Sequence, residues 1–232
     1  MKVVLLTFAS VLFSCAAQAA TSIDIQVADT LAPPACNVTL GNHGLVDYGT
    51  IHITRLNNDA NAYSVLDEKR LSLNIQCESA TRVAIKGTSN RRGTLAGAAE
   101  GALNGSGFAP VKLFGLQRAA ATGLGSVNGR KTGGFGMRLV PGSATADGRS
   151  VAPFYRHAHI PGTWNFSDEG LILHPADDIQ TSWSLIHDGN PLPFSVLSAE
   201  LAVQAYINKK NELDLSQSFM LDGSVTLELI YL

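Results

Sequence analysis

Leu71-Ser72-Leu73-Asn74-Ile75-Gln76-Cys77 alternates apolar and polar side chains without interruption. Successive side chains of a β-strand point to opposite faces, so this alternation predicts a strand with one face in a core. The end of the chain repeats the pattern, with Val225, Leu227, Leu229 and Tyr231 on one face and Thr226, Glu228, Ile230 and Leu232 on the other. The two stretches predict a protein built from β-strands.

Shorter strand signals occupy the chain between and around these two stretches. They are residues 83–85, 111–116, 135–140, 171–173, 181–186 and 201–207. Asn-Gly and Asp-Gly pairs, which favour tight turns, separate several of them. Many short strands joined by such turns are typical of an all-β sandwich or barrel. Glycine is concentrated in residues 87–149, which form either long surface loops or weakly packed strands, with a role that the sequence leaves open.

Charge and composition exclude two broad classes of protein. The 232 residues carry Lys+Arg 17 against Asp+Glu 19, so a general nucleic-acid binder, which needs a basic excess, is disfavoured. With 45% hydrophobic and 16% charged residues, the chain is too apolar for an intrinsically disordered protein. The length is sufficient for one large domain or two small ones, with a core in either case.

The N-terminal residues are typical of an export signal. Lys2 precedes an apolar run that ends at Phe13, and Ala17-Gln18-Ala19 matches an A-x-A cleavage site. We therefore expect residues 1–19 to be a signal peptide and the mature product to be exported. The alternative, acylation of Cys15 in a lipoprotein box, is disfavoured because Phe13 fits that pattern poorly.

Removal of the signal peptide leaves two of the three cysteines, Cys36 and Cys77. An even pair in an oxidising compartment is expected to form a disulfide rather than two free thiols. Two isolated cysteines supply too few ligands for a structural metal site. The sequence therefore predicts a Cys36–Cys77 disulfide.

Residues 21–31 form a further alternating stretch, with Ile23, Ile25 and Val27 on one face. Pro33-Pro34 separates this stretch from the rest of the chain, because proline cannot donate to a strand ladder. We predict an N-terminal extension over residues 20–35 and one domain over residues 36–232. The extension either completes a sheet in a neighbouring molecule or joins its own sheet.

Motifs for catalysis and for cofactors are missing from the sequence, which has no G-x-S-x-G, no H-E-x-x-H and no P-loop. We therefore expect no enzyme activity, cofactor or catalytic residue. His157 and His159 would share one face of a strand, yet a metal site needs three or four ligands, so we expect none. Trp164 and Trp183 are candidates either for packing or for stacking on a sugar. Lys86, Arg91 and Arg92 form a small basic patch, which we interpret as an exposed turn.

Two segments around the cysteines resemble a chaperone–usher fimbrial, or pilin-like, subunit. They are Ala35-Cys36-Asn37-Val38-Thr39-Leu40 with residues 44–51, and residues 71–77 with Thr81-Arg82-Val83-Ala84. Residues 112–116 and 221–229 are similar to one fimbrial-like subgroup whose domain is of the unknown-function type. The resemblance covers most of the mature chain.

The resemblance implies an all-β fold, namely an incomplete immunoglobulin-like β-sandwich with an N-terminal donor strand. Cys36 and Cys77 would join the first two strands, and Val225, Leu227, Leu229 and Tyr231 would line the groove left by the missing strand. Donor residues would be Ile23, Ile25, Val27 and Leu31. Unlike many pilin donor strands, residues 21–31 contain no glycine.

The implied function is that of a structural fimbrial subunit, polymerised by donor-strand complementation and contributing to cell adhesion. Implied partners are a periplasmic fimbrial chaperone, an outer-membrane usher, neighbouring subunits and a host-surface receptor. The chain would pass through the periplasm to the cell surface. The alternative is a fimbrial tip adhesin or a periplasmic carbohydrate-binding module that uses Trp164, Trp183 and the loops around His157.

Overall fold

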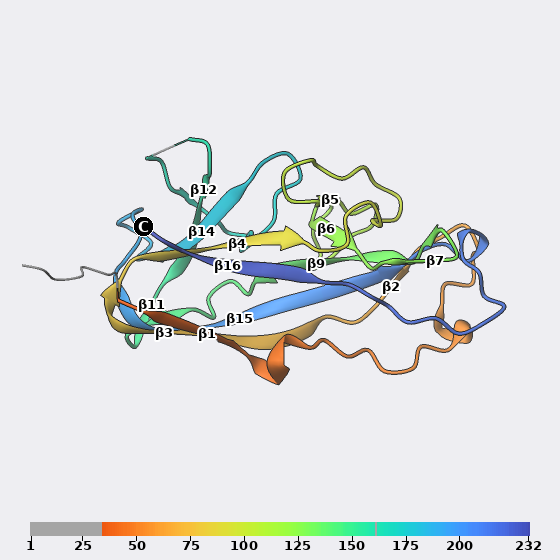
Figure 1. Cartoon of the computed structure of the whole chain (residues 1–232), viewed down its shortest axis with the longest axis horizontal. Helices are drawn as coiled ribbons and strands as arrows, with labels where there is room; N and C mark the ends of the chain where they lie inside the picture. The colour runs from red at the N-terminus through yellow and green to blue at the C-terminus, as the bar shows by residue number, and fades with distance from the viewer. Residues whose placement is uncertain (1–33, 161) are drawn as a thin grey trace, which may run out of the picture. The chain divides into compact units, whose positions relative to one another are not determined.

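The alternating stretch at residues 71–77 lies within the long strand β3 (Lys69–Thr81), near the middle of one sheet. The structure is a computed structural model that describes residues 34–160 and 162–232 (Figure 1). β3 pairs antiparallel with β15 (Phe194–Ile207) over most of its length. Leu73 and Ile75 are fully buried, as the alternation predicts.

Two antiparallel sheets make up the fold, which confirms the prediction of an all-β sandwich. The larger sheet runs β1 (Cys36–Leu40), β3, β15, β9 (Gly133–Leu139), β6 (Ala120–Gly123) and β5 (Gly107–Phe108), with β2 (Ser64–Val65), β10 (Thr145–Ala146) and β11 (Arg149–Ser150) attached. The second sheet runs β13 (Asn165–Phe166), β12 (Ala152–His157), β14 (Ile179–Ser184), β4 (Val83–Ser89) and β16 (Val225–Tyr231). The remaining elements are the hairpin of β7 (Ser126–Val127) with β8 (Arg130–Lys131) and the short 3-10 turns η1 (Gly41–Gly44), η2 (Ile53–Arg55) and η3 (Lys210–Glu212).

The main core lies between the two sheets and is closed by large side chains. Trp183 of β14 packs edge-on against Phe194 of β15, with ring centroids 6.0 Å apart, and both side chains are 0% exposed. Leu73 and Ile75 from β3 and Val83 and Ile85 from β4 join the same cluster. Trp183 is therefore a packing residue, the first of the two roles considered for it.

The glycine-rich residues 87–149 include strands β5 to β10 and pack with Tyr206 of β15 in a separate core cluster. Leu95, Leu113 and Tyr206 are fully buried there, and the Tyr206 hydroxyl donates a 2.6 Å hydrogen bond to the Ala96 carbonyl. A Cβ on Gly134 would lie 2.6 Å from both Leu95 Cδ1 and Tyr206 Oη. Close packing thus requires glycine at position 134. The region combines short strands with loops, because residues 90–106 and 109–119 contain no named strand.

Two of the shorter strand predictions are wrong. Residues 111–116 form a turn, because Phe114 and Gly115 adopt positive φ values of 55° and 80° between Leu113 and Leu116. Residues 171–173 make only one isolated bridge, from Leu171 to Arg138, although Ile172 and Leu173 are buried. The strand predicted at 181–186 lies two residues earlier, as β14.

Several predictions concern residues that the structure does not describe. The signal peptide of residues 1–19 lies outside the described part of the chain, as does most of the 20–35 extension. The donor residues Ile23, Ile25, Val27 and Leu31 also lie outside it, so their roles stay predictions. Residues 34–232, apart from residue 161, belong to one compact unit.

Candidate functional site

The candidate site is formed by two edge strands, one from each sheet, which we call the β1–β16 seam. β1 pairs with β3 in the register Cys36↔Cys77 to Leu40↔Leu73, and β16 pairs with β4 in the register Val225↔Ser89 to Tyr231↔Val83. Each is the terminal strand of its sheet among the described residues, so its second edge has no strand partner there (Figure 1).

The inward side chains of both edge strands contact the main core but are not fully buried. Val38 and Leu40 of β1, with Leu227 and Leu229 of β16, are half-buried against the cluster that contains Leu73. Leu73 itself, on the neighbouring strand β3, is 0% exposed. The core is therefore closed at its centre and partly open along the seam.

The start of β16 is fixed to the end of β4 by polar contacts. Arg91 donates from Nε to Asp222 Oδ2 at 2.8 Å and from Nη2 to Asp222 Oδ1 at 2.6 Å. This guanidinium holds the pKa of the Asp222 carboxyl below its ordinary value. The Asn90 amide nitrogen Nδ2 donates to Ser224 Oγ at 2.9 Å and to Thr226 Oγ1 at 3.0 Å. These bonds hold the edge strand in one position.

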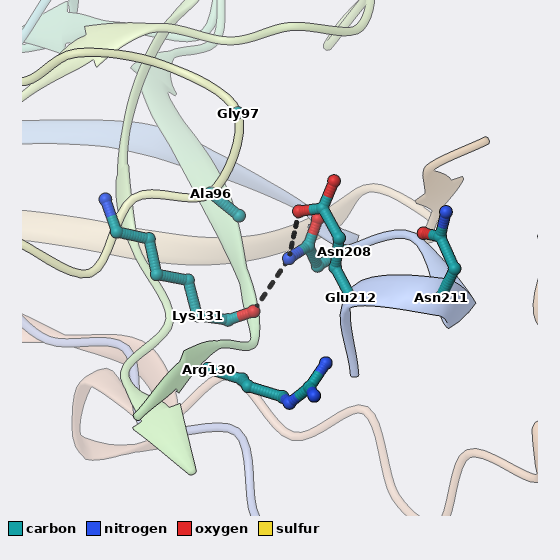
Figure 2. Close-up of a pocket in the computed structure, with 7 residues that line it drawn as sticks. All are labelled: Ala96, Gly97, Arg130, Lys131, Asn208, Asn211 and Glu212. Carbon is teal, nitrogen blue, oxygen red and sulfur yellow. Dashed lines mark hydrogen bonds between the residues drawn. The ribbon is translucent and has the colours of Figure 1, made fainter. Parts of the chain in front are cut away.

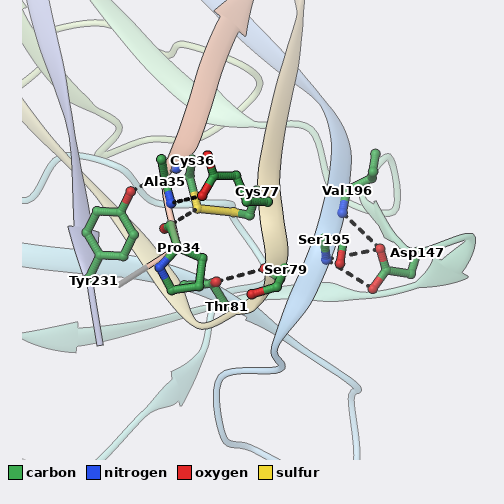
Figure 3. The surroundings of a disulfide bond; sticks show 11 residues. Pro34, Ala35, Cys36, Cys77, Ser79, Thr81, Asp147, Ser195, Val196 and Tyr231 are labelled. Carbon is green, nitrogen blue, oxygen red and sulfur yellow. Dashed lines mark hydrogen bonds between the residues drawn. A yellow bond between two sulfur atoms is a disulfide. The ribbon is translucent and has the colours of Figure 1, made fainter. Parts of the chain in front are cut away.

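The other end of β16 lies against the start of β1, as Figure 3 shows. The Cys36 backbone N–H donates a 2.9 Å hydrogen bond to the Tyr231 hydroxyl, and the Leu232 N–H donates to the Arg82 carbonyl at 3.0 Å. The predicted Cys36–Cys77 disulfide is confirmed and joins directly opposed residues of β1 and β3. The seam is thus linked across both sheets at this end.

The segment that follows β1 is attached to β15 by Tyr48, a residue that the sequence analysis did not single out. Its hydroxyl donates to the Val203 carbonyl at 3.4 Å and accepts from the Ala205 N–H at 3.2 Å. The ring packs in a second core cluster with Leu56 and Phe135. Burial raises the pKa of Tyr48 to about 12.

We predict that Tyr48→Phe lowers the free energy of unfolding by about 1–2 kcal/mol, because it removes both hydrogen bonds and leaves a backbone N–H without its partner. In the native protein the folded state holds the Tyr48 proton more tightly than the unfolded chain, whose tyrosines ionise near pH 10. The free energy of unfolding of the native protein therefore falls as the pH rises from about 10 towards about 12. Tyr48→Phe has no hydroxyl to ionise at this position, so its free energy of unfolding should not show this contribution to the fall.

Urea unfolding of both proteins between neutral pH and pH 11 measures this difference. Tyr155→Phe is the matched control, because its hydroxyl makes no hydrogen bond to another described residue. Equal stability of Tyr48→Phe and the native chain at neutral pH would contradict the assigned role.

The residues considered for sugar or metal binding are dispersed or engaged elsewhere. Trp183 is buried, and half-buried Trp164 lies under the Arg156 guanidinium, 4.8 Å from its ring centroid. His157 ends β12 with Nδ1 2.6 Å from Asp177 Oδ2, whereas His159 lies in the following turn. Within the described residues, no group of three or more His, Cys, Asp or Glu is placed to hold a metal ion.

The predicted basic patch is not a free cationic surface. Lys86 Nζ lies 2.6 Å from Asp178 Oδ2, and Arg91 is bound to Asp222. Arg92 donates to the carbonyls of Ala102 and Leu103 at 2.9 and 2.7 Å. These cations hold loops in place, so the interpretation as a simple exposed turn is incomplete.

Figure 2 shows a polar pocket of about 290 Å³ beside η3. The Asn208 side chain donates to the Lys131 carbonyl at 2.9 Å and to Glu212 Oε2 at 3.2 Å, while Lys131 Nζ donates to the Leu95 carbonyl at 3.0 Å. Several of its polar groups are therefore already hydrogen-bonded within the protein.

Across the described residues, no helix is long and apolar enough to cross a bilayer.

The fold and the seam define an all-β sandwich protein with a partly open edge between its sheets. Residues 25–136 match a family described as "Protein of unknown function (DUF1120)". This similarity agrees with the domain-of-unknown-function part of the resemblance found in the sequence.

Two relatives from Escherichia coli strain K12 span nearly the whole chain. The chain is 27% identical to "Uncharacterized protein YhcF" over 100% of this chain and 99% of the relative. It is 28% identical to "Protein GltF" over 95% of this chain and 92% of the relative. No solved structure matches the chain.

Proposed function

We propose that this protein is a structural subunit of a chaperone–usher fimbria, polymerised by donor-strand complementation and contributing to cell adhesion. The observation that carries the proposal is the β1–β16 seam, where two edge strands face a partly open core. Half-buried Val38, Leu40, Leu227 and Leu229 supply an apolar lining for an added strand. Free strand edges supply backbone donors and acceptors for β-augmentation.

An unfilled seam is a hazard for a single chain, because exposed strand edges template aggregation. A strand from a neighbouring subunit removes this hazard and buries Ile23, Ile25, Val27 and Leu31. At about 1.5–3 kcal/mol for each side chain, burial contributes about 6–12 kcal/mol before ordering costs are subtracted. Such a contact can hold a fibre together without covalent bonds between subunits.

The need to cover the open seam also motivates the proposed partners and the proposed path of the subunit to the cell surface. A periplasmic chaperone would cover the seam first, and an outer-membrane usher would exchange it for the extension of the next subunit. The fibre would stand on the cell surface, where a host receptor is its proposed target. The similarity to a family of unknown function is compatible with this proposal and does not itself specify assembly.

Deletion of residues 21–31 tests the proposal in cells that express the full set of assembly proteins. The truncated subunit should accumulate with its chaperone in the periplasm and be absent from the interior of surface fibres, because it has no strand to donate. The measurement is the ladder of heat-sensitive multimers from sheared surface material, compared with the periplasmic subunit.

A matched control keeps the strand and changes its other face, with Ser22, Asp24 and Gln26 replaced together by alanine. This variant should assemble, because the apolar side chains that enter the seam are unchanged. Normal fibres from the deletion variant would disprove donation by residues 21–31.

A further inference from the structure

A second pocket, of about 380 Å³, lies away from the seam, between strands β5 and β6 and residues 169–175. Leu116, Leu171 and Leu173 form an aliphatic part of its lining, and Arg118 and Glu169 line it as well. A pocket of this size is within the range that holds a small organic ligand. Apart from Leu116, which ends the 112–116 segment of the fimbrial resemblance, these residues belong to no enzyme motif and to no segment of that resemblance.

The walls of this pocket are held in place by buried contacts. The Asn104 side chain, 2% exposed, donates to the His174 carbonyl at 2.9 Å and to the Asp177 carbonyl at 3.0 Å. Gly101 lies so close to the same loop that a Cβ would come within 1.9 Å of the Pro175 carbonyl oxygen. The pocket is therefore largely formed before any ligand enters, which lowers the ordering cost of binding.

Two opposite charges line this pocket without neutralising each other. The exposed Arg118 guanidinium stacks on Phe108, 4.0 Å from the ring centroid, so the contact orients it without using its hydrogen-bond donors. Neither Arg118 nor Glu169 forms a salt bridge or a side-chain hydrogen bond with any described residue. A free cation and a free carboxylate thus line one cavity.

The remaining lining distinguishes between classes of ligand. One face of Phe108 lies under Arg118, and its ring forms a T-shaped pair with His174 at 6.5 Å between ring centroids. The other apolar lining residues are aliphatic. Sugars favour a flat, free aromatic face, whereas a branched aliphatic side chain suits a lining of leucines. Burial, followed by the charge of His157, lowers the pKa of His174, which lines the same pocket.

We propose that this pocket binds a zwitterionic amino acid with an aliphatic side chain. Arg118 receives the α-carboxylate, Glu169 receives the α-ammonium, and the side chain rests on Leu116, Leu171 and Leu173. The site is independent of the proposed fimbrial function, because it shares no residue with the β1–β16 seam.

Binding of L-leucine to the purified full chain, followed by titration calorimetry and ligand-observed NMR, tests this site. L-leucine should bind saturably, whereas leucinamide, which lacks the carboxylate, and 4-methylpentanoate, which lacks the ammonium, should each bind at least about tenfold more weakly. Glycine, which lacks the aliphatic side chain, should also bind more weakly. A hexose should not compete.

Substitutions of the two charged lining residues test whether L-leucine binds in this pocket. Arg118→Gln and Glu169→Gln should each weaken L-leucine binding by about tenfold to a hundredfold, because each removes a charged partner. Lys112→Gln is the matched control, since Lys112 is exposed but does not line the pocket. The proposal would be overturned by no saturable binding of L-leucine, by binding of either truncated ligand as tightly as L-leucine, by unchanged affinity in both variants, or by stronger binding of a hexose. All of these readouts are independent of fibre assembly.

Discussion

Replacement of both Cys36 and Cys77 by serine is expected to lower the free energy of unfolding by about 4 kcal/mol. The disulfide closes a loop with a sequence separation of 41, and the loss of chain entropy in the unfolded state accounts for this magnitude. This loss is a large fraction of the total free energy of unfolding of a typical domain, which is about 5–15 kcal/mol. It should leave a protein that unfolds near physiological temperature.

The consequence should be strongest at the seam, because β1 has few other attachments. β1 pairs with β3 alone among the described strands, and its first N–H is bound to the Tyr231 hydroxyl. Without the covalent link the strand can fray and expose Val38 and Leu40. The variant should therefore show faster hydrogen exchange at β1 than at β15, where the central ladder has partners on both sides.

Urea unfolding with far-UV circular dichroism measures the stability, and exchange mass spectrometry locates the loss. Reduction of the native protein should reproduce the result of the double variant. Thr39→Ser is the control, because it changes an exposed side chain of the same strand and keeps the disulfide. A difference below about 1 kcal/mol between the double variant and the native protein would show that the disulfide contributes little to folding.

The core strands follow from local periodicity, and the errors have a local physical cause. Alternation at residues 71–77 and at Val225, Leu227 and Leu229 needs only one buried face, so β3 and β16 could be predicted. Residues 111–116 are as apolar as a strand, but Phe114 at φ 55° and Gly115 at φ 80° reverse the chain. Hydrophobicity alone carries no signal for that backbone conformation.

The parts of the sites that depend on distant contacts could not be read from the sequence. Tyr48 is more than 150 residues from Ala205, whose N–H it accepts. Arg118 and Glu169 line one pocket although they are about 50 residues apart, and buried Asn104 fixes the neighbouring loop through the carbonyls of His174 and Asp177. The Cys36–Cys77 pair was predictable, since removal of the predicted signal peptide leaves two cysteines and therefore one pairing. The partners of long-range polar contacts cannot be deduced from a count of residues in this way.

Under the proposed donor-strand assembly, replacement of Leu227 by aspartate should abolish incorporation of the subunit into fibres. Leu227 lies on the inward face of β16 and is half-buried against the main core. In the free subunit a carboxylate there can reach water at the partly open seam. Once a donor strand covers the seam, the same charge is buried among Val38, Leu40 and the donor side chains without a cation. Such burial costs several kcal/mol, which offsets most of the gain from the donor strand.

The neighbouring residue provides the control. Thr226 points to the outer face of the same strand and is exposed, so Thr226→Asp adds the same charge without placing it under the donor strand. The aspartate carboxylate can accept the Asn90 hydrogen bond that the threonine hydroxyl accepts in the native chain. The measured quantities are the multimer ladder of surface fibres and, for each purified subunit, the midpoint of thermal unfolding. Leu227→Ala separates charge from lost volume and should reduce assembly without abolishing it. Assembly of Leu227→Asp at the level of Thr226→Asp would show that the inward face of β16 does not receive a neighbouring strand, and the seam would then be an ordinary pair of sheet edges.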